Sequence, residues 1–567
     1  MALKEKPLRL ATGFVLAVAT LLTRLPFRAH TFFEFDSINF AVAIFRFSLR
    51  EVTPQMPGYI LHVLLGRLLY TITGDLNSAY LWLSMLLSIG SVLFLWRAAA
   101  QMRGERVAII AALIWLTTPL FWFQGEVAAV YAHEAFFTAW LLYLGMKLLN
   151  DSKRYDLVYL LLIVFSLATG ARQSSILFFL PAIVFLLWKI HISKKHLFLA
   201  VVGYVIITTL WFGELVRESG GLSTYLYSVH HESIFKSQSV LFGNSWQSEF
   251  DTISKVAFYL PIAMGASILA LIAILLTFPL RTLRFARAFR SNPKALYIVL
   301  IALPALLFYF FIFFMKAGYF LNVIPSAILI IAVLIDQAAI WLAEFEKRRS
   351  ENKLQFTRPI ITRNVAMLTS AVMGINCLWF FVRWPGTDQT RFNNEDTRNS
   401  FIRGAVNRFD DSQDRWLTLA NRAFAYTNVS GFRAVDSLND MTLRALEARG
   451  ANDSNSTIIA TWWSRWTYLL LPHANTYDVE PGIANTIAVG YSRELHRENI
   501  FDSVTRIHSS GPMLLLMRHD RTNFAEVNKQ LHLERLSLPE YLDIYKILDT
   551  GFTLRLQDRT FLVNRSQ

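Results

Sequence analysis

The sequence predicts a multi-pass α-helical membrane protein that carries a C-terminal α/β domain outside the membrane. Three observations support this fold class. Hydrophobic residues make up 54% of the 567-residue chain and charged residues only 17%, well below the roughly 25% of a soluble domain. Apolar runs of about 17–25 residues, long enough to cross a bilayer as helices, follow one another along most of the chain. After Trp384 these runs shorten to strand length and polar residues become frequent.

The apolar runs predict about eleven membrane-spanning helices. They cover residues 8–27, 77–97, 107–124, 127–149, 155–171, 173–190, 196–215, 255–280, 295–315, 319–343 and 360–383. Within the first run, Leu10–Leu25 follows Lys4, Lys6 and Arg9 and lacks a small-residue cleavage site, so we expect it to remain as an anchor. A further apolar run, 57–73, is short and contains Arg67. We expect this run to be re-entrant or to lie along the membrane interface.

Basic residues between the apolar runs predict the orientation of the chain. If residues 57–73 do not cross the membrane, the basic clusters fall on one side, which the positive-inside rule assigns to the cytoplasm. These clusters lie at 97–106, 281–294 and 344–363. The N-terminus is then inside, whereas the loop 216–254 and the C-terminal part are outside. This orientation accounts for the net charge of +14 without a nucleic-acid partner.

The C-terminal part, residues 384–567, is predicted to be a soluble α/β domain tethered to a membrane domain of residues 1–383. Alternating helices and strands are typical of such a layered domain. Helices are predicted at Asp440–Arg449, Ser492–Asn499 and Asn523–Leu531, and strands at Thr457–Thr461, Met513–Met517 and, as a pair that turns at Asp549–Gly551, within Tyr545–Leu562. Asn-x-Ser/Thr triplets at Asn428, Asn452, Asn455 and Asn564 are weak signals for glycosylation.

The outer face carries an acidic loop, Thr31–Phe40, directly after the first span. Glu34 and Asp36 stand there among aromatic residues, where desolvation costs on the order of 2–7 kcal/mol even for a neutral polar group. Further ionisable groups on the same face are functional candidates, because such groups are rare within membranes. They are Glu126, His133, Glu134, Arg172 and Lys316. Taken singly, each is also explained by a helix end, an ion pair or a loop that avoids lipid.

These residue types fit the transfer of a group from a lipid-borne phosphate. A carboxylate can take the proton of an acceptor hydroxyl, and general-base assistance gives about 10²–10⁴ in rate. Arginine or lysine can stabilise a departing phosphate without a general acid. The sequence has no Gly-rich phosphate-binding loop, which argues against an ATP-driven machine. Its single cysteine, Cys377, excludes a disulfide or a cysteine-based metal site within one chain.

Several short motifs follow one another over residues 10–330. They are Phe35-Asp36-Ser37-Ile38-Asn39-Phe40, Met56-Pro57-Gly58-Tyr59-Ile60-Leu61, Leu64-Leu65-Gly66-Arg67-Leu68-Leu69, Thr118-Pro119-Leu120-Phe121-Trp122, Ala129-Val130-Tyr131, Gly170-Ala171-Arg172 before Leu180-Pro181, and Lys316-Ala317-Gly318-Tyr319 before Ile324-Pro325. In this order they resemble the GT-C class of integral-membrane glycosyltransferases, specifically the protein O-mannosyltransferase-like bacterial group. The chain departs from that pattern at Asn39, where the family has an acid, and at Gln55-Met56-Pro57-Gly58, where it has His-Pro-Pro-Gly.

The resemblance implies an inverting hexosyltransferase that uses a polyprenyl-phosphate-sugar donor among the lipids of a bacterial plasma (inner) membrane, with its active site and C-terminal domain outside the cytoplasm. It implies Asp36 as the catalytic base, and Glu34 is a second catalytic candidate that substitutes for the missing acid. We expect Arg172 and Lys316 to bind the donor phosphate. The remaining candidates for the donor or acceptor cleft are Asn39, Gln55, Glu126, Tyr131, His133 and Tyr319.

Several alternatives stay open at this point. The acceptor hydroxyl could belong to a protein, a lipid or a glycan, and a divalent metal at Glu34 and Asp36 is neither required nor excluded. Asp36 could be only the N-cap of an interfacial helix over Ile38–Arg50, and Arg172 and Lys316 could extend to the interface. A transporter or lipid flippase would be expected to show paired repeats, which are not evident. A non-catalytic scaffold with a binding ectodomain would not need acids and cations in one cleft.

Overall fold

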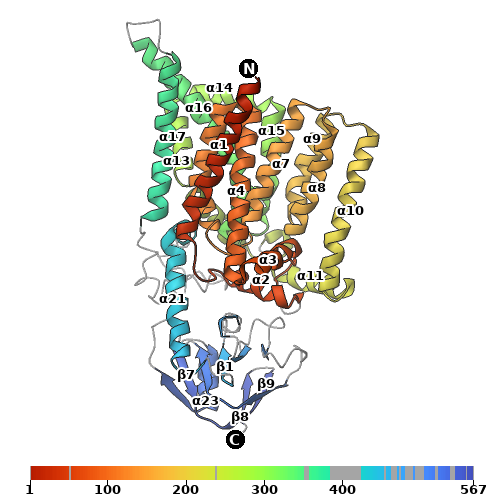
Figure 1. The fold of residues 1–567 in the computed structure, drawn as a ribbon, viewed down its shortest axis with the longest axis vertical. Coiled ribbons are helices and arrows are strands. Elements are labelled where there is room, and N and C mark those ends of the chain that lie inside the picture. Colours follow the sequence, from red (N-terminus) through yellow and green to blue (C-terminus); the bar gives the residue numbers. More distant parts are fainter. Residues whose placement is uncertain are drawn as a thin grey trace.

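The structure, a computed structural model, shows a helical bundle joined to a smaller β-rich region (Figure 1). It describes residues 2–49, 53–236, 239–349, 357–382, 423–451, 455–460, 469–471, 474–478, 490–491, 504–517, 522–536, 543–556 and 559–565.

Long apolar helices make up the bundle. They are α1 (Ala2–Arg24), α4 (Leu76–Arg103), α5 (Glu105–Thr117), α7 (Ala132–Asn150), α8 (Tyr155–Ala171), α9 (Ser175–Lys189), α10 (Lys194–Glu218), α12 (Trp246–Met264), α13 (Ala266–Thr277), α15 (Pro293–Phe311), α16 (Ile324–Arg349) and α17 (Thr357–Phe381). Small residues let these helices approach one another closely. The ring of Tyr297 in α15 fills the space beside Gly145 of α7, and its hydroxyl donates to the Leu141 carbonyl at 2.9 Å.

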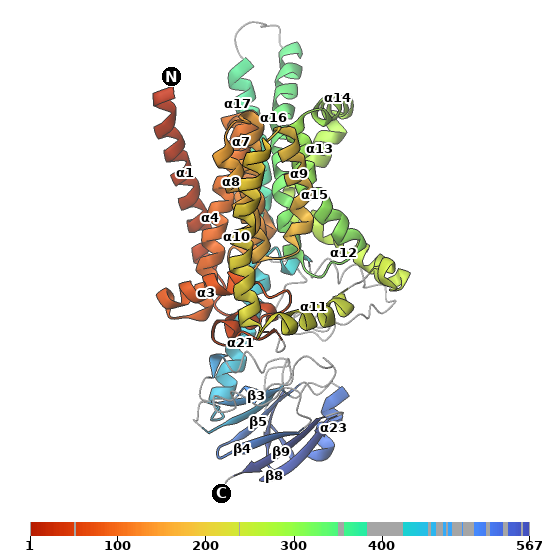
Figure 2. The same cartoon turned by 90° about the vertical axis from the view of Figure 1, so that its right-hand side faces the viewer.

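The two ends of the bundle differ in chemistry (Figures 1 and 2). The N-terminus and the basic helix α14 (Pro279–Arg290) lie at one end. The opposite end carries the short helices α2 (Phe35–Phe45), α3 (Ile60–Thr73) and α11 (Leu222–Lys236), together with the C-terminal region. The segments that the positive-inside rule assigns to one side therefore lie together, away from the acidic loop.

Six helices of the described residues are long and apolar enough to cross a membrane, and a seventh results if a bent pair counts as one span. They are α1, α4, α10, α15, α16 and α17, and the bent pair is α12 with α13. The multi-pass helical membrane fold is thus confirmed. The runs predicted at 155–171 and 173–190 form the shorter apolar helices α8 and α9 of the same bundle, and the run at 127–149 forms α7, which begins at Ala132.

Two other predicted spans are interrupted where a proline or a glycine changes the backbone. The run 107–124 divides into α5 and α6 (Pro119–Gln124), because Pro119 lacks the N–H that would continue the helix. The run 255–280 bends by 92° between α12 and α13. Gly265 lies at this bend with a φ of 56°, and a Cβ there would stand 2.5 Å from the amide oxygen of Asn376. The prediction of continuous helices at these two places was wrong.

The helix α3 agrees with the expectation that residues 57–73 do not cross the membrane. It has 14 residues and is about 21 Å long at 1.5 Å per residue, whereas the apolar core of a bilayer is about 30 Å thick. It begins and ends at the end of the bundle that carries α2 (Figure 2). Gly74 follows it with a φ of 66°, and Asp75 then caps α4 by accepting from the Ser78 amide at 2.7 Å.

The segments around α3 differ from the prediction in two respects. The interfacial helix expected over 38–50 is α2, which begins earlier at Phe35 and ends at Phe45. After it, Ser48 pairs with Thr53 in an isolated antiparallel bridge. Residues 216–254, expected as one long loop, contain α11 and the 3-10 turn η3 (Val240–Phe242).

The C-terminal region combines a long helix with two sheets. The helix α21 (Val429–Glu447) runs from the bundle toward the sheets (Figure 1) and includes most of the helix predicted at Asp440–Arg449. The other elements are β1 (Thr457–Ala460), β2 (Asn475–Asp478), β3 (Gly490–Tyr491), β4 (Val504–Ser509), β5 (Met513–Met517), α23 (Thr522–Gln530), β6 (Leu533–Leu536), β7 (Asp543–Ile547), β8 (Gly551–Leu556) and β9 (Arg559–Arg565). Strands follow the order β3-β2-β1-β5-β7-β6 in one sheet and β4-β9-β8 in the other.

Strand pairing in this region corrects one prediction. The strands expected to pair across Asp549 are β7 and β8, but β7 lies between β5 and β6 in the larger sheet, and β8 pairs with β9. An alternating pattern marks a strand without choosing its partner. The helix predicted at Ser492–Asn499 lies outside the described residues. Asn428, one of the glycosylation triplets, is fully buried, so the folded chain cannot carry a glycan there.

Candidate active site

The acidic loop meets a lysine from a distant part of the chain at the end of the bundle. Glu34 precedes α2, Asp36 lies in its first turn, and Lys316 precedes the 3-10 helix η4 (Ala317–Asn322). The Lys316 ammonium donates to Glu34 Oε2 at 2.7 Å and to Asp36 Oδ2 at 2.5 Å. Three of the predicted site residues therefore form one charged cluster.

The two acids of this cluster differ in exposure. The Glu34 side chain is 4% exposed and that of Asp36 is 27% exposed. Burial raises the pKa of the Glu34 carboxyl, Lys316 opposes this rise, and the Asp36 carboxylate adds to it. Burial disfavours the charge on Lys316, but Asp36 and Glu34 outweigh it and hold the pKa of Lys316 well above its usual value. Lys316 thus stays charged, and Asp36 is the more accessible carboxylate.

A second buried cation, Arg172, lies near this cluster. It directly follows α8, and its Nη1 donates to Glu134 Oε1 in the first turn of α7 at 2.9 Å. Its guanidinium also lies 4.2 Å from the centre of the Tyr319 ring, a distance at which arginine and an aromatic ring attract one another. Since Tyr319 belongs to η4, which begins next to Lys316, this ring connects the two cations.

Tyrosine side chains surround this connection. The ring centres of Tyr131 and Tyr319 are 5.7 Å apart. Gly318 makes room for the Tyr131 ring, since a Cβ at this position would lie 2.3 Å from it. Tyr59, which precedes α3, is within electrostatic range of Arg172 and Tyr319. Its φ of 43° is unusual for a residue with a side chain, and such strain gathers at functional sites.

Three further candidates for the cleft are His133, Asn39 and Gln55. His133 pairs with His62 of α3, with ring nitrogens 3.1 Å apart, and both rings are buried. Asn39 is buried within α2. Gln55 is partly exposed in the loop before α3, where its backbone carbonyl accepts from the Gly58 amide at 3.0 Å. The structure thus places His133 against α3 and Asn39 inside the packing of α2.

Glu126 was predicted to line the cleft, but the structure places it with the first helix. Its Oε1 accepts from Trp122 Nε1 at 2.8 Å. Arg24, at the end of α1, is fully buried with its guanidinium over the Trp122 ring at 5.6 Å, and its charge attracts that of Glu126. The structure thus places Glu126 beside Trp122 and Arg24, and a part for it in the donor or acceptor cleft stays a prediction.

The geometry does not support two simpler explanations of the site residues. Asp36 is not the N-cap of α2, because Glu34 holds that position and no side-chain hydrogen bond caps the helix. Arg172 and Lys316 do not extend to the interface. Arg172 is buried against Glu134, and Lys316 is bonded to both acids of the cluster.

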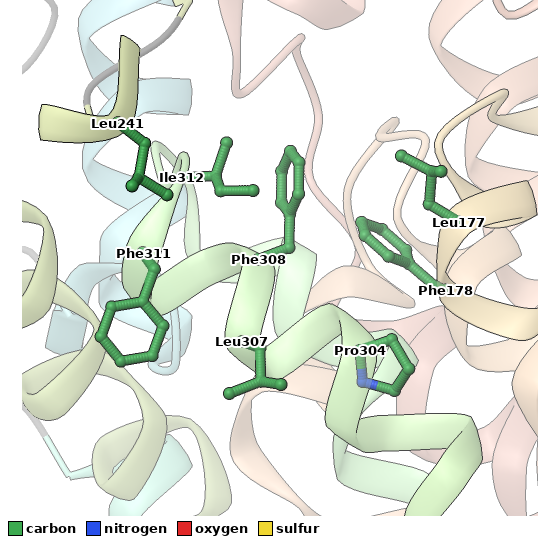
Figure 3. A pocket seen from close by; sticks show the side chains of 8 residues that line it. All are labelled: Leu177, Phe178, Leu241, Pro304, Leu307, Phe308, Phe311 and Ile312. Carbon is green, nitrogen blue, oxygen red and sulfur yellow. The ribbon is translucent and has the colours of Figure 1, made fainter. Parts of the chain in front are cut away.

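An apolar groove lies between α9, η3 and α15 (Figure 3). It has a volume of about 390 Å³ and is lined by Leu177 and Phe178 of α9, Leu241 of η3, and Pro304, Leu307, Phe308, Phe311 and Ile312 in and after α15. Phe178 packs against Tyr309 at 5.6 Å between ring centres, and Tyr309 stacks on Tyr319 at 5.7 Å. A continuous row of aromatic rings therefore leads from the groove to Arg172.

Comparison with known proteins bears on the family of this chain. Residues 54–212 match the family model described as dolichyl-phosphate-mannose-protein mannosyltransferase. The predicted family resemblance is confirmed. The stretch that matches the mannosyltransferase model contains α3, Tyr131, Glu134 and Arg172, whereas Asp36 and Lys316 lie outside it. The comparison with curated proteins gave no significant match.

The fold of this chain is similar to that of ArnT from Cupriavidus metallidurans. The ArnT structure bound to undecaprenyl phosphate matches with a TM-score of 0.52 and 13% identity, and the apo structure with 0.53 and 14%. Both alignments cover 96% of this chain and 98% of ArnT. The apo oligosaccharyltransferase of Archaeoglobus fulgidus has 12% identity over 76% of this chain and 65% of its own, but its TM-score of 0.39 adds no support.

A divalent metal at Glu34 and Asp36 stays a prediction. No group of three or more His, Cys, Asp or Glu side chains that could hold a metal ion occurs in the described ranges, whereas Mg²⁺ is usually held by only one or two carboxylates together with waters and substrate phosphates. The Lys316 ammonium already bonds to both Glu34 Oε2 and Asp36 Oδ2.

The sequence pattern did not single out some residues that the structure adds to the site. Tyr59 belongs to a motif of the mannosyltransferase-like resemblance, but only the backbone shows its unusual φ. Asn322 Nδ2 donates to the Tyr309 hydroxyl at 2.6 Å and so orients the ring that stacks on Tyr319. Asn322 could have been predicted as a functional candidate, because it is an amide within the apolar run 319–343 and a polar group inside a membrane costs free energy.

Proposed function

We propose that this chain is an inverting membrane glycosyltransferase that moves a sugar from a polyprenyl-phosphate donor to an acceptor hydroxyl. The observation that carries the proposal is the contact between the accessible carboxylate of Asp36 and Lys316. The guanidinium of Arg172 lies near this contact, because it packs on the ring of Tyr319, three residues after Lys316. A carboxylate and two cations that lie close together suit a reaction in which the acceptor loses a proton while the donor loses a phosphate.

In the proposed reaction, the acceptor oxygen attacks the anomeric carbon while the bond from that carbon to the phosphate oxygen breaks. The acceptor proton passes to the Asp36 carboxylate. Polyprenyl phosphate departs with the bonding electron pair, and Arg172 and Lys316 stabilise its additional negative charge. Because the attack comes from the side opposite the leaving group, the configuration of the sugar is inverted.

Lys316 has a double role in this proposal. Without a ligand it bonds to both Glu34 and Asp36, and its single positive charge offsets one of their two negative charges. A donor phosphate brings new negative charge to the same ammonium, which weakens its hold on Asp36 and leaves this carboxylate to accept the proton. Glu34, which is more buried, remains a partner that keeps Lys316 in the site.

The apolar groove is the proposed binding place of the polyprenyl chain. Its lining residues are all apolar, and the aromatic row of Phe178, Tyr309 and Tyr319 joins it to Arg172. A phosphate held by Arg172 would therefore have an isoprenoid chain beside α9 and α15 (Figure 3). The ArnT structure of similar fold holds undecaprenyl phosphate, which supports this class of ligand.

The test is to incubate the purified protein with a panel of undecaprenyl-phosphate-linked sugars and to measure release of undecaprenyl phosphate. We expect one or a few of these donors to be consumed, faster when a protein, lipid or glycan acceptor is present. Undecaprenyl phosphate that is moved between leaflets of a vesicle without sugar release would instead identify a flippase.

The proposed location is the bacterial plasma (inner) membrane, with residues 1–383 as the membrane domain and residues 384–567 as a domain outside the cytoplasm. In a Cys377→Ser background, which has no other cysteine, two exposed positions report the orientation. We expect a membrane-impermeant maleimide to label Thr550→Cys on intact cells and to label Ser291→Cys only after permeabilisation. The reverse pattern would invert the proposed topology.

A further inference from the structure

The C-terminal helix α21 is bonded to the start of the acidic loop. The buried carboxylate of Asp436 accepts from the His30 amide at 3.0 and 2.9 Å, one distance for each oxygen. It also accepts from Thr31, at 2.7 Å from the amide and 2.9 Å from the hydroxyl. Hydrogen bonds to an ionised acceptor are about twice as strong as neutral ones, so Asp436 fixes this backbone in direction as well as position.

A second side chain of α21 completes the contact. Asn439, one turn further along the helix and buried, donates to the Thr31 hydroxyl at 2.9 Å and to the Phe32 carbonyl at 3.4 Å. The same helix face therefore holds three successive residues of the chain just before Glu34 and Asp36. The next residue, Phe33, packs its ring 5.5 Å from Tyr426, which precedes α21.

The helix α21 is itself attached to the membrane bundle. The Asn428 side chain, which caps α21 by accepting from the Ser430 amide at 2.9 Å, donates to the carbonyls of Trp379 at 2.8 Å and Val382 at 2.7 Å. These carbonyls lie in the last turn of α17 and directly after it. The helix thus joins α17 to the acidic loop as one rigid support.

We propose that α21 positions the catalytic carboxylate through the acidic loop, with Asp436 and Asn439 as positioning residues of the transferase. This inference rests on the proposed function, in which Asp36 takes the acceptor proton. The contact gives the C-terminal region a role in the reaction itself. A displacement of about 1 Å in a reacting group can reduce a rate about 10²-fold. The bonds from Asp436 to Thr31, five residues before Asp36, therefore affect turnover without touching the substrate.

The test compares Asp436→Asn with Asp440→Asn in the full-length protein. Asp440 lies on the same helix, but its side chain is 52% exposed and pairs with Arg444, so it is a matched control. In Asp436→Asn an NH₂ group replaces one of the two carboxylate oxygens that accept from the His30 amide, so two donors face one another there. We expect amide hydrogen exchange of the peptide containing His30 and Thr31 to become at least about tenfold faster, since the amides lose one of two acceptor oxygens and the negative charge that strengthens these bonds.

In the same variant we expect kcat to fall about tenfold to a hundredfold, while the KM for the most active undecaprenyl-phosphate sugar changes less than about threefold. Asp440→Asn should match the wild type in both measurements. A second variant, Thr31→Val, removes the hydroxyl shared by Asp436 and Asn439 and should show the same changes in smaller degree. It serves if Asp436→Asn does not fold.

Two results would overturn the inference. One is wild-type kcat in Asp436→Asn and Thr31→Val despite faster exchange of the loop. The other is a lowered kcat with unchanged exchange, which would mean that the helix acts by another route. If the wild-type protein consumes no donor, the proposed function fails, and the exchange comparison alone still decides whether α21 holds the acidic loop.

Discussion

Asp36→Asn should reduce sugar transfer by at least about 10²-fold, because an amide cannot accept the acceptor proton at neutral pH. The folded state should change little. Asparagine has the same size as aspartate, Asp36 does not cap α2, and its side chain is partly exposed. Lys316 also keeps its bond to Glu34. The measurement is kcat with the most active donor, together with the melting temperature of the detergent-solubilised variant.

Glu34→Gln is the matched control for this variant. It makes the same chemical change two residues away, on the same lysine, but in a side chain that is only 4% exposed. It should therefore reduce transfer less than Asp36→Asn while it loosens Lys316. If Asp36→Asn retains near-normal transfer, Asp36 is not the base. A large loss in Glu34→Gln alone would then transfer that role to Glu34.

The features that could be predicted from the sequence are those that depend on neighbouring residues in the same segment of the chain. The apolar runs marked the helices, and Arg67 with the basic clusters indicated that residues 57–73 stay on one side, as α3 does. Ionic groups in apolar surroundings are costly, and this cost, together with the resemblance that implies Asp36 as the base, marks Glu34, Asp36 and Lys316 as candidates. The structure then showed that these three groups bond to one another.

What could not be predicted depends on partners that lie far apart in the chain. Glu126 and Glu134 are both acids beside or within the apolar run 127–149, so the sequence does not distinguish them. In the structure Glu126 interacts with Arg24, whereas Glu134 bonds to Arg172. The bend at Gly265 follows from packing against Asn376. Asp436 is an unremarkable acid of an amphipathic helix until its carboxylate is seen to accept from the acidic loop. Spacing within a segment carries no information on such contacts.

Arg172→Ala is expected to reduce kcat/KM for the donor about tenfold to a hundredfold, as about 1.5–3 kcal/mol is lost with a hydrogen bond to a charged group. Among the described residues, the hydrogen bond from Nη1 to Glu134 is the one recorded for this guanidinium, which leaves its other N–H groups for a phosphate. The change also leaves Glu134 buried without its partner, and breaking such a pair costs about 3–5 kcal/mol of stability.

The two effects separate in the double variant Arg172→Ala/Glu134→Gln. Neutral glutamine removes the unpaired buried charge, so the melting temperature should recover, whereas donor use should not, because the phosphate still lacks its cation. Arg217→Ala is the control for loss of an arginine. Its side chain is 68% exposed and pairs with Glu214 and Glu218, so its loss should change neither donor use nor stability appreciably. Binding of undecaprenyl phosphate, titrated directly, gives the decisive comparison. If the double variant binds this lipid as tightly as the wild type, Arg172 stabilises α7 through Glu134 and does not hold the donor.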